Sequence, residues 1–221
     1  MTDWEAILAR HSVRVYEARP IPAELRQELE RFARRCEEEG GLHILLRFDD
    51  PEGFDSRLAH YGSFRNVANY IVLAGKKEED FDFRCGYFGE KLVLHAQKLG
   101  LNTCWAALSF NRKWVRDQLP EGESLGLAIA LGFGQNQGRQ HRSKRPEQVS
   151  QLSGPAPDWF QKGLEAALLA PTAINQQKFC FSLENDEPTV RVKGIGSCTR
   201  IDLGIAALHF ELGSGRSVKV R

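Results

Sequence analysis

The segment GYFGEKLVLHAQKLGLNTCWAAL, residues 86–108, decides the fold. The side chains in it that share one helical face are Phe88, Leu92, Leu94, His95 and Leu99. This spacing predicts a long buried helix over residues 87–99, and Gly100 supplies the left-handed residue at which many helices end. Small residues around Trp105 then form a separate segment over residues 102–108.

Outward from this helix, apolar runs and proline or glycine boundaries predict further strands and helices. Two continuous apolar runs, residues 70–74 and 125–134, are typical of central strands buried on both faces. Shorter strands are expected over residues 43–48, 178–183 and 190–192, and helices over residues 3–9, 22–40, 159–169 and 201–212. The remaining long stretches, residues 49–65 and 135–151, are expected to be a loop with a helical turn and a polar, basic linker.

Part of this pattern occurs twice. Sliding the chain by 113 residues pairs Cys85 with Cys198 and Gly100 with Gly213, and each helix aligned in this way follows a helix, a strand and a turn. A few matches are weak support alone, but the shared order of elements favours two pseudo-symmetric halves, residues 1–150 and 151–221. We expect these halves to share one core in a single domain over residues 1–221.

The composition excludes several classes of protein. Of the 221 residues, 42% are hydrophobic and 27% are charged, which is typical of a folded globular chain. Thirty Lys and Arg against 29 Asp and Glu give a net charge of +1, so no global field would hold nucleic acid or an anionic membrane. The longest apolar run, residues 125–133, is far below the roughly 20 residues of a membrane span.

The cysteines and the N-terminus indicate a cellular compartment. The five cysteines show no CxxC spacing, which predicts free thiols in a reducing compartment and no metal site. The first nine residues include Asp3 and Glu5 and lack the basic and apolar regions of a signal peptide. We therefore expect a cytoplasmic protein.

Two basic clusters and one loop of small residues offer candidate chemistry. Residues 10–14, RHSVR, place two guanidiniums, an imidazole and a hydroxyl close together, a set that suits phosphate oxygens. Residues 139–145 form the second basic cluster. Residues 170–177, APTAINQQ, offer small side chains that let a flat ligand approach and amides that both donate and accept. Each segment taken alone is also compatible with a solvated surface loop.

In combination these segments resemble the nitroreductase family of FMN-dependent oxidoreductases. RHSVRVY at 10–16 and APTAINQQKF at 170–179 look like the two hallmarks of that family. Residues 86–108 resemble its central helix and following loop, and LGFG at 131–134 with HRSKRPEQV at 141–149 resembles its last core strand and phosphate-binding tail. The resemblance implies an α+β fold with a mixed, mainly antiparallel sheet flanked by helices.

The order of the motifs departs from the ordinary family pattern. In ordinary members the Asn-containing loop follows the arginine motif by a few tens of residues, whereas here residues 30–42 lack it and it lies at 170–177. Ordinary members are homodimers in which each flavin is shared by two subunits. This order resembles the fused variant, the TM nitroreductase group, and implies a monomer that acts as an intramolecular pseudo-dimer with one FMN site, the second site being lost.

The resemblance also implies which residues bind FMN. Those expected at the ribityl chain and phosphate are Arg10, His11, Ser12, Arg142 and Lys144. Arg14 would lie near N1 and O2 of the ring, where a fixed cation favours the reduced flavin. The loop residues expected along the ring and its polar edge are Pro171, Thr172, Ala173 and Asn175, and those beside N5 are Trp105, Ala106 and Ala107.

The implied activity is transfer of two electrons from NAD(P)H to a small acceptor, such as a nitroaromatic, a quinone or a free flavin, by a ping-pong mechanism. The flavin carries this chemistry, so no catalytic protein side chain is expected. An alternative from another class is a flavin-binding sensor or carrier without turnover, and a specialised chemistry such as dehalogenation stays open. His95 and His209 are expected to be core histidines, and Cys104 is a minor candidate for a redox role.

Overall fold

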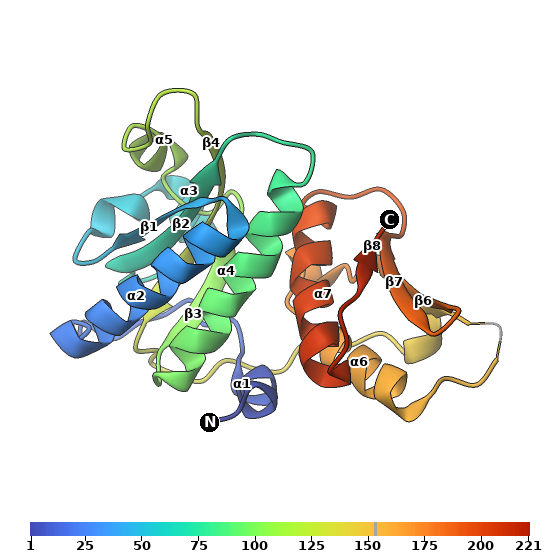
Figure 1. Ribbon diagram of the computed structural model, residues 1–221. Coiled ribbons are helices and arrows are strands. Elements are labelled where there is room, and N and C mark those ends of the chain that lie inside the picture. Colours follow the sequence, from blue (N-terminus) through green and yellow to red (C-terminus); the bar gives the residue numbers. More distant parts are fainter. Residues whose placement is uncertain (153) are drawn as a thin grey trace. The chain divides into compact units, whose positions relative to one another are not determined.

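The computed structural model describes residues 1–152 and 154–221, which fall into two compact units. The larger unit comprises residues 10–81 and 91–139, and the smaller unit comprises residues 1–9, 82–90 and 140–221. Each unit contains one four-stranded sheet (Figure 1). The predicted α+β class, with strands flanked by helices, is confirmed. The division into repeats at residue 150 stays a prediction.

The sheet of the larger unit is antiparallel throughout and has the strand order β1-β2-β4-β3. Its strands are β1 (His43–Arg47), β2 (Asn69–Gly75), β3 (Asn102–Ala106) and β4 (Ser124–Gly132). β2 is buried at every position and β4 at most, which explains why both are continuous apolar runs in the sequence.

The helices of the larger unit are mostly short. α2 (Ala23–Gly40) packs against β1 and ends where Gly41 adopts a left-handed conformation, φ 56°, with its N–H donating to Glu37 O. The region predicted as a loop with a helical turn contains η1 (Pro51–Gly53) and α3 (Arg57–Tyr61). α5 (Arg112–Arg116) was not predicted, because its five residues are too few to show a helical period.

The smaller unit is built around a hairpin. Its sheet has the order β5-β6-β7-β8, with β5 (Ser150–Gln151), β6 (Phe179–Glu184), β7 (Glu187–Val192) and β8 (Lys219–Val220). β6 and β7 are antiparallel, and the outer strands join them in parallel. Asn185 and Asp186 are both left-handed, as a two-residue hairpin turn requires. β5 and the short η2 (Pro146–Gln148) lie in the stretch predicted as a linker.

A buried helix, α7 (Thr199–Ser214), forms the centre of the smaller unit. All ten residues from Ile201 to Phe210 are buried, the pattern of a helix covered on every side. Phe210 stacks on Phe181 with ring centroids 4.5 Å apart and meets Phe160 of α6 (Asp158–Leu168) edge-on at 5.2 Å. α1 (Asp3–Ala9) also packs on α7.

α7 crosses a second helix at unusually close range. α4 (Phe81–Lys98) begins six residues before the predicted helix, and its part over residues 82–90 belongs to the smaller unit. A Cβ on Gly86 would lie 2.0 Å from Ile201 O, and a Cβ on Gly204 would lie 2.1 Å from Phe83 O. Both positions therefore require glycine, and the two contacts are reciprocal.

The positions of α4 and α7 differ from the 113-residue interval of the predicted repeat. α4 and α7 begin 118 residues apart, and Gly86 and Gly204 are separated by the same interval. The 113-residue slide instead pairs Cys85, inside α4, with Cys198, which precedes α7 in a left-handed conformation. The two cysteines therefore do not occupy equivalent helical positions, and the internal repeat stays a prediction.

Both helical histidines have protein partners, as expected for core histidines. His209 is fully buried, with Nε2 2.9 Å from Glu90 Oε1 and Nδ1 3.1 Å from Ala166 O. In the larger unit, His95 stacks on Phe32 with centroids 4.0 Å apart.

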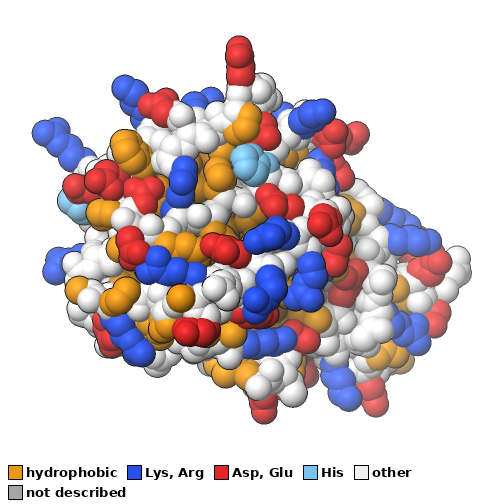
Figure 2. Space-filling model, turned by 60° about the vertical axis from the view of Figure 1, so that its left-hand side comes forward, with side chains coloured by type: hydrophobic (Ala, Val, Ile, Leu, Met, Phe, Trp, Pro, Cys, Tyr) orange, Lys and Arg blue, Asp and Glu red, His pale blue; other side chains and the backbone are white. Residues whose placement is uncertain are grey.

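The surface carries both signs of charge. On the face drawn in Figure 2, Lys and Arg side chains are interspersed with Asp and Glu, in agreement with the net charge of +1. Among the described residues, no helix is long and apolar enough to cross a membrane.

The helix crossing yields a stability prediction. Gly204→Ala should lower the free energy of unfolding by about 1–3 kcal/mol, because the added methyl overlaps Phe83 O and forces the helices apart. Thermal or urea unfolding measures the effect. Gly154→Ala is the matched control, since its added Cβ would meet nothing within 4 Å. Equal stability of the two variants would show that the crossing is not tightly packed.

Candidate functional site

The arginine motif, residues 10–16, is held in the larger unit by backbone hydrogen bonds on both sides. Ser12 and Thr103 form a parallel bridge, with Val13 N donating to Thr103 O at 3.0 Å. Farther along, Arg65 N donates to Arg14 O and Gln135 N donates to Val15 O. The motif is therefore an extra strand-like segment beside β3, with a fixed backbone from which its side chains project.

Two glycines let the chain after β4 approach this motif. A Cβ on Gly138 would lie 2.7 Å from His11 Cβ, and one on Gly134 would lie 2.7 Å from Val13 Cγ1. Asn102 holds the segment after β4 in place, because its Oδ1 accepts from Gly134 N and its Nδ2 donates to Gln137 Oε1. The glycine at 134, part of the LGFG motif, thus has a packing role next to the arginine motif.

The two arginines of the motif differ in environment. Arg10 is buried, with 4% of its surface exposed, whereas Arg14 is exposed and has no hydrogen-bond or ion-pair partner among the described residues. Burial raises the pKa of the neighbouring Cys104 thiol, and the nearby Arg14 offsets this only in part. Cys104 is therefore a protonated, buried thiol, which argues against the redox role considered for it.

The predicted N5 segment lies beside the arginine motif. Trp105 and Ala106 end β3, the strand whose Thr103 pairs with Ser12. Trp105 is half-buried, Ala106 is buried, and Ala107 O accepts a hydrogen bond from Arg112 Nη1 at 2.9 Å. All the predicted site residues before 110 are thus gathered on one edge of the larger unit.

The Asn-containing loop, residues 170–177, is the most strained segment of the smaller unit. Ile174, Asn175 and Gln177 have positive φ values of 46°, 55° and 42°. A β-branched residue in this region is uncommon, and such residues typically cost about 1–3 kcal/mol each. Ile174 is also 94% exposed, so the loop displays an apolar side chain beside Asn175.

Asp202, in the first turn of α7, holds this loop. Its Oδ1 accepts from Ala173 N at 3.0 Å and its Oδ2 accepts from Gln176 Nε2 at 2.6 Å. Only 3% of the residue is exposed, and burial raises its pKa to about 6 despite these hydrogen bonds. Asp202 is the loop anchor that the sequence did not reveal.

The basic segment after residue 140 holds the loop from the other side. Lys144 Nζ donates to the carbonyl oxygens of Gln176 and Gln177 at 2.8 and 2.9 Å, and Asn175 Nδ2 donates to Arg142 O at 2.8 Å. Partial burial, with repulsion from Lys193 and Lys178, lowers the pKa of Lys144. One of its three N–H groups remains for a ligand, and the exposed Arg142 guanidinium has no partner among the described residues.

The structure thus gathers the predicted site residues into two sets. Arg10, His11, Ser12, Arg14, Trp105, Ala106 and Ala107 form one edge of the larger unit. Arg142, Lys144, Pro171, Thr172, Ala173 and Asn175 form a hydrogen-bonded cluster in the smaller unit. The assignment of both sets to one ligand stays a prediction.

The cysteines and acidic residues do not indicate a metal centre. All five cysteines are free thiols, and four are buried. Within residues 1–152 and 154–221, no group of three His, Cys, Asp or Glu side chains could hold a metal ion.

Comparison with known proteins places the chain in a family. The sequence profile of the family described as "Putative TM nitroreductase" matches residues 4–214. A nitroreductase structure from Thermotoga maritima is 23% identical, with a TM-score of 0.68 over 96% of this chain and 83% of that one. No curated protein matches the chain.

Two more distant structures share part of the fold. One from Parabacteroides distasonis, titled an NADH dehydrogenase or NAD(P)H nitroreductase, has a TM-score of 0.53 at 21% identity over 66% of this chain and 95% of that one. An NADPH:FMN oxidoreductase from Vibrio harveyi, complexed with NAD⁺, has a TM-score of 0.52 at 18% identity over 65% and 72%. At these identities the likeness is one of fold.

The loop anchor yields a pH prediction. The folded-state pKa of Asp202, about 6, lies above its ordinary 3.8, so ionisation disfavours the folded state and stability falls as pH rises through this window. Between pH 4.5 and 7.5 the wild type should lose about 2 kcal/mol relative to Asp202→Asn, which cannot ionise. Urea unfolding of both proteins at both pH values measures this difference. Parallel pH profiles would contradict the assigned burial of the carboxylate.

Proposed function

Because the chain belongs to the TM nitroreductase family, we propose that it is an FMN-dependent oxidoreductase. It passes two electrons from NAD(P)H to a nitroaromatic, quinone or flavin acceptor by a ping-pong mechanism. In this proposal a single chain supplies both the arginine motif and the Asn-containing loop, which ordinary family members take from two subunits.

The observation that carries the proposal is the arginine motif itself. Its backbone is fixed by hydrogen bonds to Thr103, Arg65 and Gln135, while the Arg14 guanidinium is exposed and has no partner among the described residues. A cation held on a rigid segment stabilises negative charge that develops beside it without first having to reorganise. Arg14 is thus suited to the polar edge of a flavin ring.

The smaller unit offers cations suited to the phosphate of FMN. The phosphate carries roughly −1.5 to −2 charges near neutral pH. Among the described residues the Arg142 guanidinium has no partner, and Lys144 keeps one N–H group after bonding two carbonyls of the loop. Asn175 keeps its carbonyl oxygen and one N–H for a ligand, because its hydrogen bond to Arg142 O uses only one donor.

When bound, FMN would supply hydride acceptance and donation at its ring. The residues of this chain would position the ring and keep water away from it. Ala106 and Ala107 leave room beside the half-buried Trp105, and Ile174 presents an exposed apolar side chain. No protein acid or nucleophile is needed for this role.

The first test uses the purified protein. It should carry flavin absorbance that NADPH or NADH bleaches without oxygen, and a nitroaromatic or quinone should restore the colour. A protein that neither retains nor binds FMN would refute the proposal. A flavin-loaded protein that neither donor reduces would instead support the sensor or carrier.

A second test concerns Arg14. Arg14→Ala should lower the flavin reduction potential by tens of millivolts, since about 30 mV corresponds to 1.4 kcal/mol for a two-electron couple. Arg14→Lys should restore part of the loss. Arg116→Ala, which removes an exposed cation of α5 in the larger unit, is the matched control. An unchanged potential in Arg14→Ala would remove Arg14 from this role.

A further inference from the structure

Three lysines of the smaller unit, Lys144, Lys178 and Lys193, form a cluster in which no carboxylate pairs with them. Lys144 Nζ donates to two carbonyls of the Asn-containing loop. Lys178 Nζ donates to Ile195 O, and Lys193 Nζ donates to Gln148 O at 2.8 Å. Within residues 1–152 and 154–221, none of the three ammonium groups of this lysine cluster forms an ion pair. Backbone carbonyls hold each Nζ in place and leave its charge uncompensated.

Lys178 and Lys193 lie directly opposite each other, at the end of the β6–β7 hairpin that is farther from its turn. Phe179 pairs with Val192 in the strand register, and one step beyond this pair Lys193 N donates to Lys178 O at 3.0 Å. Opposite residues of an antiparallel pair point to the same face, where like charges repel each other. The buried Phe179 occupies the other face, so the two ammonium groups share one face of the hairpin.

Lys144 adds a third positive charge to this pair. Burial, followed by repulsion from Lys193 and Lys178, lowers the pKa of Lys144, so both lysines lie within electrostatic range of it. After the hydrogen bonds to carbonyls, Lys144 keeps one N–H group, and Lys178 and Lys193 keep two each. The lysine cluster therefore combines mutual repulsion with N–H donors that remain for an anion.

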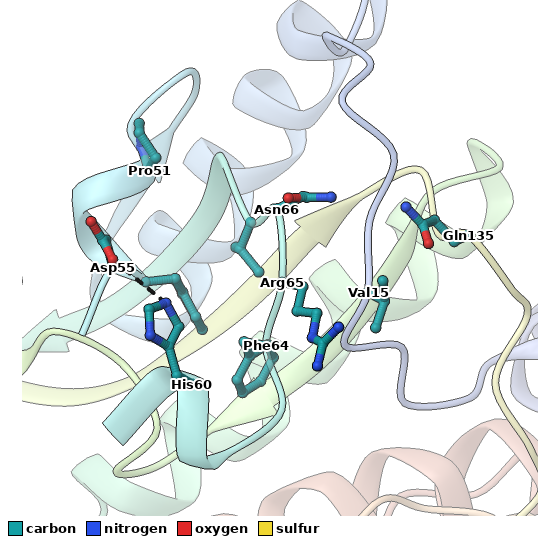
Figure 3. Close-up of a pocket in the computed structure, with 10 residues that line it drawn as sticks. Val15, Pro51, Asp55, His60, Phe64, Arg65, Asn66 and Gln135 are labelled. Carbon is teal, nitrogen blue, oxygen red and sulfur yellow. Dashed lines mark ion pairs between the residues drawn. The ribbon is translucent and has the colours of Figure 1, made fainter. Parts of the chain in front are cut away.

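The pocket of the larger unit drawn in Figure 3 has a different balance of charge. Arg65 and His60 line it together with Asp55, and Asp55 Oδ1 lies 3.5 Å from His60 Nε2. A carboxylate in the same lining offsets positive charge there. The lysine cluster has no carboxylate in that role, so a bound anion would relieve the repulsion among its ammonium groups.

We propose that the lysine cluster binds a phosphate monoester. Near neutral pH this group carries roughly −1.5 to −2 charges and three strong acceptor oxygens, so it offsets more of the positive charge than a single carboxylate does. Lysine binds phosphate as a point charge and needs no planar partner. The family motifs place Lys144 at a phosphate, whereas they assign no role to Lys178 or Lys193.

Two ligands of the proposed reaction carry a phosphate monoester. FMN has one on its ribityl chain, and NADPH has one at the 2′ position of a ribose. The identification of the ligand with either molecule rests on the proposed function. The phosphate site itself rests only on the lysine cluster.

The test compares two pairs of ligands that differ by one phosphate, FMN with riboflavin and NADPH with NADH. In Lys178→Gln and in Lys193→Gln, the Kd of FMN or the KM of NADPH should rise about tenfold or more, the equivalent of one lost charge-assisted hydrogen bond. The phosphate-free member of the same pair should be unaffected, which a merely structural role of the lysines would not explain. The pair that responds identifies the source of the phosphate. Lys193→Arg should retain most of the binding, because it keeps the cation.

Lys219→Gln is the matched control, because Lys219 Nζ lies in the same unit and already pairs with the Glu187 carboxylate. It should bind all four ligands as the wild type does. Two results would overturn the proposal: unchanged binding of both pairs in Lys178→Gln and Lys193→Gln, or equal weakening of both members of a pair.

Inorganic phosphate separates this proposal from the proposed function. If the wild type binds neither flavin nor nicotinamide, the proposed function fails, and titration of inorganic phosphate followed by phosphorus NMR tests the lysine cluster directly. The wild type should then bind phosphate about tenfold or more tightly than Lys178→Gln and Lys193→Gln. No phosphate binding, or equal binding in all three proteins, would overturn the lysine cluster as a phosphate site.

Discussion

The close crossing of α4 and α7 constrains the smaller unit. Gly86 and Gly204 bring the two backbones together, so each helix can shift little along the other. This fixes the first turn of α7, where Asp202 accepts hydrogen bonds from Ala173 N and Gln176 Nε2. The position of the Asn-containing loop therefore follows from the packing of two helices. The left-handed residues of that loop persist because Asp202 and Lys144 bind it from both sides.

In the larger unit, backbone hydrogen bonds hold the predicted site residues in place. The arginine motif is not part of a helix or a named strand. Backbone hydrogen bonds to Thr103, Arg65 and Gln135 fix its conformation. Because the backbone atoms make these bonds, the Arg14 side chain stays available for a ligand.

Periodicity and apolar runs were enough to predict the main elements. The helix ending at Gly40 and the buried strand β2 lie within a residue or two of their predicted bounds. The spacing of apolar residues in the sequence directly reflects which of their positions are buried. The family, too, followed from short motifs, and the profile match confirms it. Contacts between distant segments could not be predicted. Nothing in the sequence pairs Gly86 with Ile201, and an aspartate in a first helical turn looks like an ordinary partner of the helix dipole. Lys144 looked like a phosphate ligand, whereas two of its donors bind loop carbonyls.

The proposed function requires one chain to hold all the parts of a flavin site. Native mass spectrometry of the freshly purified protein tests this requirement, because it reports chain number and bound cofactor together. We expect a dominant species with the mass of one chain and one FMN. Flavin found only on a dimer, or a monomer that never carries FMN, would contradict it.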